Sequence, residues 1–127
     1  MGERSDHRQS DGPAVAGIVL FLLIIVWLAF GQTLRNGFVN YDDDAYVYQN
    51  PVVMAGLTRS GIMWALRFGA IGHWHPVTWF SHMLDWRLFG PAAGGHHLTS
   101  VILHAATAIL LFLALKQMTS ALWRSAM

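Results

Sequence analysis

Residues 14–34 read AVAGIVLFLLIIVWLAFGQTL, and this stretch decides the fold because it contains no charged residue. A helix that is apolar on every side belongs in a membrane or in a large protein core. The whole chain has 127 residues, which is too few to enclose such a helix in a large core. At 1.5 Å per residue the stretch spans about 30 Å, the thickness of the hydrocarbon layer. We therefore predict a first transmembrane helix at 14–34, preceded by a tail at 1–13.

A cleaved signal peptide is the alternative interpretation of this stretch. Arg4 and Arg8 precede it, and Ala29-Phe30-Gly31 has the small-x-small pattern of a cleavage site. The apolar part is, however, longer than the roughly 7–15 residues that are usual in signal peptides. The length favours an anchor that is not cleaved.

A second apolar stretch, HLTSVILHAATAILLFLAL, occupies residues 97–115. Its polar residues His97, Ser100, His104 and Thr107 are spaced by three, four and three, which places them on one face of a helix. A polar group that faces lipid has no hydrogen-bond partner. We predict a second transmembrane helix whose polar stripe faces other helices or a wet cavity.

The composition excludes several classes of protein. The chain is 54% hydrophobic and 12% charged, about half the charge of a soluble domain, so it is neither disordered nor an ordinary soluble globule. A net charge of +1 gives no basic surface for nucleic acid, and we expect no nucleic-acid partner. The absence of cysteine excludes disulfides and thiolate chemistry.

The charges that flank the two stretches predict their orientation. Arg4 and Arg8 precede the first, and Lys116 and Arg124 follow the second. Lys and Arg collect on the cytoplasmic side of a membrane, so both termini, including the end at 116–127, are placed in the cytoplasm. The fold class is then an all-α membrane protein, with two transmembrane helices joined by a long external loop at 35–96.

The external loop is too long and too aromatic to be a plain connection. Its aromatic and β-branched residues at 38–48 favour extended structure, and Asn50-Pro51 after them marks a turn. Thr58 is a good N-cap for a helix to about Phe68, and Pro76 suits the first turn of another helix. We interpret both as amphipathic helices lying in the membrane interface, anchored by Trp64, Trp74, Trp79 and Trp86. A small soluble hairpin packed on itself is the alternative.

Three adjacent carboxylates, Asp42, Asp43 and Asp44, lie close to the end of the first span. A carboxylate there is able to serve as general base for a hydroxyl nucleophile or to bind a divalent cation. The alternative is a solvated acidic turn in which Asp44 caps a short helix.

The histidines offer a second kind of chemistry. His73 and His75, with His82 or an aspartate as third ligand, have the residue types of a metal site. Spacing alone does not assign them, so we assign no metal ligands and no cofactor from the sequence. A divalent cation at the aspartates stays open.

Several segments in order resemble the start of a known family. They are the acidic run with Asn50-Pro51 eight residues on, the segment His75-Pro76-x-Thr78, the turn Leu88-Phe89-Gly90, and HHLTSVILH at 96–104. Over about residues 15–126 the chain resembles bacterial relatives of the membrane protein O-mannosyltransferase-like proteins that carry tetratricopeptide repeats. The resemblance implies the N-terminal part of a type C glycosyltransferase fold, truncated here and inactive alone.

The resemblance also implies a reaction and its residues. Such proteins transfer a sugar from a polyprenyl-phosphate donor, in the membrane lipid, to an acceptor hydroxyl such as a protein Ser or Thr. The acidic pair of the family falls on Asp42 and Asp43, with Asp42 as the base. The departing phosphate needs positive charge or hydrogen-bond donors, for which Arg67, His75 and His97 are candidates. The expected location is the bacterial inner membrane.

Two other functions remain open. The first is a two-span interaction or assembly protein whose loop docks a partner. The second is a small metal-binding membrane protein that uses the histidines.

Overall fold

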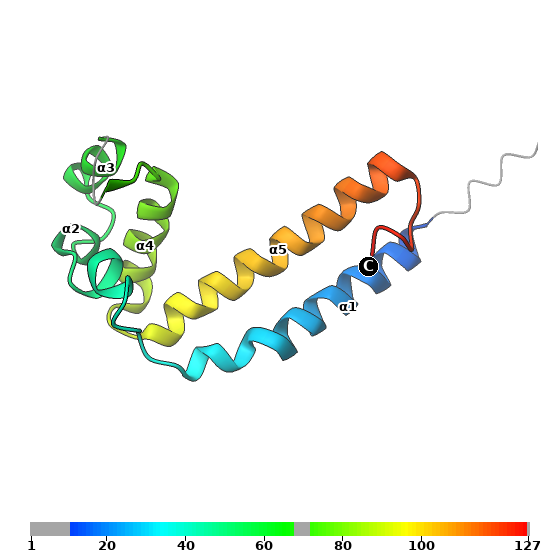
Figure 1. The fold of residues 1–127 in the computed structure, drawn as a ribbon, viewed down its shortest axis with the longest axis horizontal. Helices are drawn as coiled ribbons and strands as arrows, with labels where there is room; N and C mark the ends of the chain where they lie inside the picture. The colour runs from blue at the N-terminus through cyan, green and yellow to red at the C-terminus, as the bar shows by residue number, and fades with distance from the viewer. Residues whose placement is uncertain (1–10, 68–71, 127) are drawn as a thin grey trace, which may run out of the picture. The chain divides into compact units, whose positions relative to one another are not determined.

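The computed structural model describes residues 11–67 and 72–126, which form helices and turns with no β-strand among them (Figure 1). Two compact units are found. The first, the helical pair, comprises the described parts of Met1–Ala29 and Leu103–Met127. The second, the loop module, comprises the described parts of Phe30–Ile102.

The first predicted span is a helix. α1 covers Gly12–Phe30 and is continued by a 3-10 turn, η1, at Gly31–Arg35. The turn is closed by Thr33, whose Oγ1 donates a 2.6 Å hydrogen bond to the carbonyl of Phe30. Together they make a helical segment of 24 residues that is apolar and long enough to cross a membrane. Its ends lie within two residues of the predicted ones.

The second predicted span is also a helix, and it is longer than expected. α5 covers Ala93–Thr119, 27 residues, and passes the same test of length and composition. Two hydroxyls of its polar stripe bond within the helix: Ser100 Oγ donates to the carbonyl of His96 at 3.2 Å, and Thr107 Oγ1 to that of Leu103 at 2.8 Å. These two hydroxyls therefore need no partner from another helix. That the stripe faces other helices stays a prediction.

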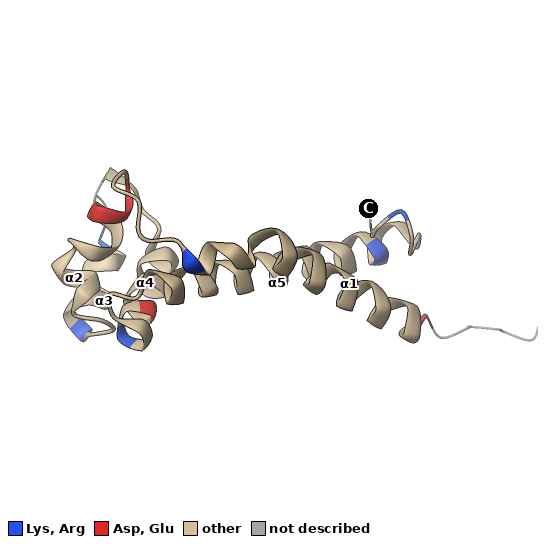
Figure 2. Cartoon of the chain, turned by 90° about the horizontal axis from the view of Figure 1, so that it is seen from below, with Lys and Arg blue, Asp and Glu red and all other residues tan. Residues whose placement is uncertain are grey.

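Large apolar side chains point outward from both long helices. Leu28 on α1 is 72% exposed and Leu110 on α5 is 66% exposed. Figure 2 shows long stretches of both helices without charge, and the ion pair of the helical pair joins their ends, Lys116 Nζ lying 3.4 Å from Asp11 Oδ2. Exposed leucines on an uncharged helix favour contact with lipid. The chain thus has two helices long and apolar enough to span a membrane.

Short helices of the loop module begin at side-chain caps. Thr58 Oγ1 accepts a 3.0 Å hydrogen bond from the backbone N–H of Gly61 and so starts α3, Arg59–Leu66, as predicted. The expected end near Phe68 lies outside the described residues. α4 covers Pro76–Phe89 and has proline in its first turn, also as predicted.

A further helix, α2 at Pro51–Met54, was expected only as a turn. The side chain of Asn50 accepts hydrogen bonds from the backbone N–H groups of Val52 and Val53 at 3.1 and 3.3 Å. An Asn cap followed by proline at the first helical position favours this start. The Asn50-Pro51 signal therefore marks a helix N-terminus rather than a turn.

The loop module has a core of its own. Trp79 and Met83 of α4 are fully buried, and they pack with Val53 of α2 and Ala65 of α3. The ring of Trp64 meets that of Trp79 edge to face, with centroids 4.9 Å apart. The prediction that Trp79 anchors the chain in the membrane interface is wrong, because no part of this side chain is left to face lipid. A module packed on itself was the alternative interpretation.

The aromatic segment 38–48 differs from its prediction as well. Asp44–Tyr48 form a turn of π-helix, η2, where we expected extended chain. Asn50 Nδ2 donates to the carbonyl of Ala45 at 3.2 Å, and the ring of Tyr46 stacks on that of Trp79 with centroids 5.0 Å apart. Strand propensity depends strongly on context, and these tertiary contacts override it here.

Candidate functional site

The three aspartates lie in the turn that leads into η2, and their carboxylates have different surroundings. Asp43 Oδ2 accepts a 2.8 Å hydrogen bond from the backbone N–H of Val39. Asp44 Oδ1 accepts one of 2.8 Å from the N–H of Ala45 at the start of η2. Both carboxylates are half-buried and hold the turn in shape. The solvated-turn alternative gave Asp44 a capping role, but Asp43 is the residue that precedes η2, and its side chain makes no capping hydrogen bond.

Asp42 is the exception. Its carboxylate is exposed, and within the described residues it accepts no hydrogen bond and makes no ion pair. Only its backbone is engaged, since its carbonyl accepts a 2.9 Å hydrogen bond from the N–H of Tyr46. The turn thus presents one carboxylate whose lone pairs are free.

Aromatic stacking connects the acidic turn to His75. The imidazole of His75 lies 5.6 Å from the ring of Tyr46 and 5.0 Å from that of Trp79, stacked on both. Its Nε2 is buried without a hydrogen-bond partner in the described residues. Because Tyr46 also bonds to the carbonyl of Asp42, the turn and His75 belong to one packed unit. The sequence placed the two 33 residues apart.

The other predicted donor groups are placed separately. His97 lies in the first turns of α5, its ring 6.4 Å from that of Phe38, and its Nε2 is buried without a partner in the described residues. Arg67 follows the last residue of α3 and is exposed. No contact joins it to the aspartates within the described part of the chain. His104, from the predicted polar stripe, is exposed on α5.

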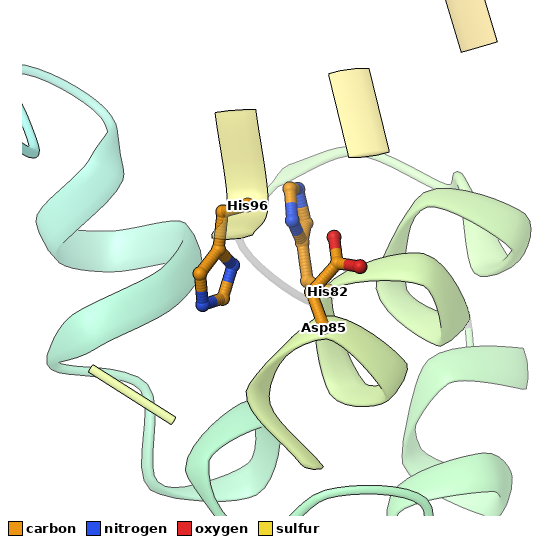
Figure 3. A group of neighbouring side chains, drawn as sticks. All are labelled: His82, Asp85 and His96. Carbon is orange, nitrogen blue, oxygen red and sulfur yellow. The ribbon is translucent and has the colours of Figure 1, made fainter. Parts of the chain in front are cut away.

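The structure also brings together three polar side chains that the sequence did not indicate as neighbours. His82 and Asp85 of α4 and His96 of α5 each offer a ligand atom, and these atoms lie within 4.8 Å of one another. Figure 3 shows the three side chains gathered between the two helices. Asp85 is 4% exposed and His96 is 6% exposed. The spacing His82-x-x-Asp85 was the available signal, but nothing in the sequence indicated that His96 joins it.

Burial and charge act against each other at His82. Burial is the largest influence, and it lowers the pKa of the His82 imidazole below its usual value. The carboxylate of Asp85 raises that pKa, whereas His96 lowers it further. Weaker influences come from Asp43, which raises the pKa, and His75, which lowers it. The net direction is downward, so the ring is held in its neutral form. His82 is thus within electrostatic reach of the acidic turn.

The histidines that sequence spacing groups together differ from the group of side chains that the structure brings together. His73 and His75 have stacked rings with centroids 6.1 Å apart. Among the described residues, these two are not part of the group with ion-binding geometry, whereas His82 is.

Comparison of the chain with protein-family models, with curated proteins and with solved structures finds no match.

Proposed function

We propose that this chain forms the first two spans and the first external loop of a membrane glycosyltransferase. The enzyme moves a sugar from a polyprenyl-phosphate donor to a hydroxyl acceptor, such as a protein Ser or Thr, and Asp42 is its general base. The observation that carries the proposal is the free, exposed carboxylate of Asp42 beside two aspartates that hold the turn.

A general base needs a lone pair within reach of the proton that it takes. Asp43 and Asp44 each have one oxygen occupied by a hydrogen bond from a backbone N–H. Within the described residues, neither oxygen of Asp42 is occupied in this way. The family resemblance assigns the acidic pair to Asp42 and Asp43, and the hydrogen bonds divide the pair into a reacting member and a member that shapes the turn.

The chain also limits how far the base lies from the membrane. Asp42 follows Arg35, the last residue of the first helical segment, by seven residues. An extended chain spans at most about 3.3–3.6 Å per residue, so Asp42 lies within about 25 Å of the end of that segment. A lipid-linked donor presents its phosphate at the bilayer surface, which is within this reach.

The reaction requires one proton transfer and one displacement. The acceptor hydroxyl gives its proton to the Asp42 carboxylate, and its oxygen bonds to the anomeric carbon of the sugar. The bond from that carbon to the phosphate oxygen breaks, and the polyprenyl phosphate leaves with the electron pair. Donors that stabilise this phosphate favour the step. His75 is suited to the role because its unpartnered Nε2 lies on the same packed unit as the turn.

The test uses the protein made from its native gene, in the membranes of its source cell. These membranes receive a polyprenyl-phosphate donor carrying labelled mannose and a peptide rich in Ser and Thr. Asp42→Asn removes the base at constant size and should lower transfer by about 100-fold or more. Asp44→Asn is the matched control in the same turn and should retain transfer.

Equal transfer by the Asp42→Asn protein and the unchanged protein would contradict the proposal, as would no transfer by either. The two-span assembly protein would then be the better interpretation, because the loop module has its own core and is able to present a folded surface to a partner.

A further inference from the structure

We propose that His82, Asp85 and His96 form a binding site for one divalent metal ion of the zinc class. His82 and Asp85 are three residues apart on α4, which places them on the same face of that helix. His96 enters from the first turn of α5, and the three ligand atoms lie within 4.8 Å of one another (Figure 3). The site is separate from the carboxylate of the proposed base, and it does not rest on the proposed function.

The hydrogen bond of His96 prepares this residue as a ligand. Its Nε2 lies 3.0 Å from the carbonyl oxygen of Gly90. A carbonyl only accepts, so Nε2 carries the hydrogen and donates it. In the neutral ring the lone pair is then on Nδ1, which is buried and has no partner among the described residues. Metal-binding histidines use the same arrangement, with one nitrogen on the ion and the other donating to a carbonyl or carboxylate.

Three aromatic rings hold the imidazole of His96 in place. The ring of Phe38 meets it edge-on at 5.2 Å between centroids, that of Trp86 lies at 6.0 Å, and that of Phe89 at 6.5 Å. A ligand whose orientation is fixed before the ion arrives loses less conformational freedom on binding.

Asp85 supplies the negative charge of the site. Its Oδ1 accepts a 2.7 Å hydrogen bond from Thr99 Oγ1, and within the described residues it has no Lys or Arg partner. A buried carboxylate without a counter-ion is costly. A bound cation would compensate this charge, and Thr99 would act as the outer partner that orients the carboxylate.

His82 completes the set of ligands. Its Nδ1 is buried and has no hydrogen-bond partner in the described residues. The described part of the chain therefore contains two buried imidazole nitrogens without hydrogen-bond partners, both close to a buried carboxylate.

The ligand types select the ion. Two imidazoles and one carboxylate suit zinc and its neighbours, whereas magnesium and calcium prefer oxygen ligands throughout. Three ligands of a tetrahedral zinc ion, each about 2.0–2.1 Å from the metal, lie about 3.3 Å from one another. The ligand atoms, now within 4.8 Å of one another, would have to approach by about 1.5 Å or less to reach this geometry. Three protein ligands leave a fourth position for water or another ligand.

The first experiment measures zinc binding by the full chain in detergent micelles. The chain is stripped with a chelator and titrated with zinc chloride against a zinc-sensitive dye. We expect one ion per chain. Asp85→Asn and His96→Gln should each weaken binding by about 100-fold or more, beyond the loss usual for an outer partner. His73→Gln is the matched control, because His73 is exposed and outside the site, and it should bind as the unchanged chain does.

A second measurement leaves the sequence unchanged, so that misfolding of a variant cannot decide the result. Cobalt chloride replaces zinc, and visible absorption reports the coordination. A strong band of tetrahedral cobalt that zinc then removes would support the site. The weak spectrum of hydrated cobalt, or zinc affinity that is equal in Asp85→Asn, His96→Gln and the unchanged chain, would overturn it.

Discussion

The hydroxyl of Thr99 donates a 2.7 Å hydrogen bond to the Oδ1 of Asp85, and this bond connects α5 to α4 inside the loop module. Thr99 is one turn beyond His96 on the same helix, so the bond also fixes the distance of the carboxylate from that imidazole. A carboxylate held by a hydroxyl keeps its second oxygen available.

Thr99→Val removes the hydroxyl but keeps the branched shape of the side chain. We expect zinc affinity to fall by about 10–100-fold, the usual effect of losing a group that orients a ligand. Thr99→Ser keeps the hydroxyl and should lose much less. Competition with a chelating dye measures both. A Thr99→Val chain that binds zinc as tightly as the unchanged chain would show that the bond does not orient a ligand.

Trp79→Ala should open a cavity in the core of the loop module. Loss of a fully buried Trp side chain costs about 3–5 kcal/mol. Val77→Ala is the control on the same helix, where the side chain is 78% exposed and its loss should cost little. Hydrogen exchange of the amides of α2 and α3 measures the free energy of opening. Equal protection of those amides in the two variants would argue against the core described above.

Asn50 makes two kinds of hydrogen bond, and two substitutions separate them. Asn50→Asp keeps the oxygen that caps α2 but loses the N–H that donates to the carbonyl of Ala45. Asn50→Ala loses both and should destabilise the loop module by about 1–2 kcal/mol for the cap alone, with a further loss from the bond to the carbonyl of Ala45. Denaturant unfolding, followed by tryptophan fluorescence, should rank the unchanged chain above Asn50→Asp and Asn50→Ala last.

The orientation of the chain is open to a clean labelling test, because the natural sequence has no cysteine. Val39→Cys, near the acidic turn, and Trp123→Cys, near the end of the chain, replace side chains that are 65% and 70% exposed. On intact cells an impermeant maleimide should label Val39→Cys, and Trp123→Cys should react only after the membrane is opened. The reverse pattern would place the aspartates in the cytoplasm and end the glycosyltransferase proposal.

Local signals in the sequence predicted much of the fold. Both long helices follow from uncharged apolar stretches of sufficient length, and the starts of α3 and α4 follow from Thr58 and Pro76. These features depend on composition and on neighbours along the chain. A pattern within one segment is enough to find them.

Contacts between distant segments were not predictable in the same way. Residues 44–48 have the composition of a strand, yet the packing of Tyr46 on Trp79 and the bond from Asn50 hold them in a helical turn. The core position of Trp79 depends on α2 and α3 meeting α4. Asp42 differs from Asp43 and Asp44 because backbone N–H groups bond to the carboxylates of those two residues. Which N–H groups face which carboxylate depends on the fold of the turn and cannot be read from the sequence.

The hydrogen bonds of Ser100 and Thr107 to their own helix have a consequence for biosynthesis. A nascent segment that leaves the translocation channel for lipid gives up the water around its side chains. A hydroxyl that already donates to a carbonyl one turn earlier gives up little at that step. If α5 spans a membrane, it would partition into lipid at little cost from these two positions as soon as it is synthesised, and docking with other segments would be a later, separate event.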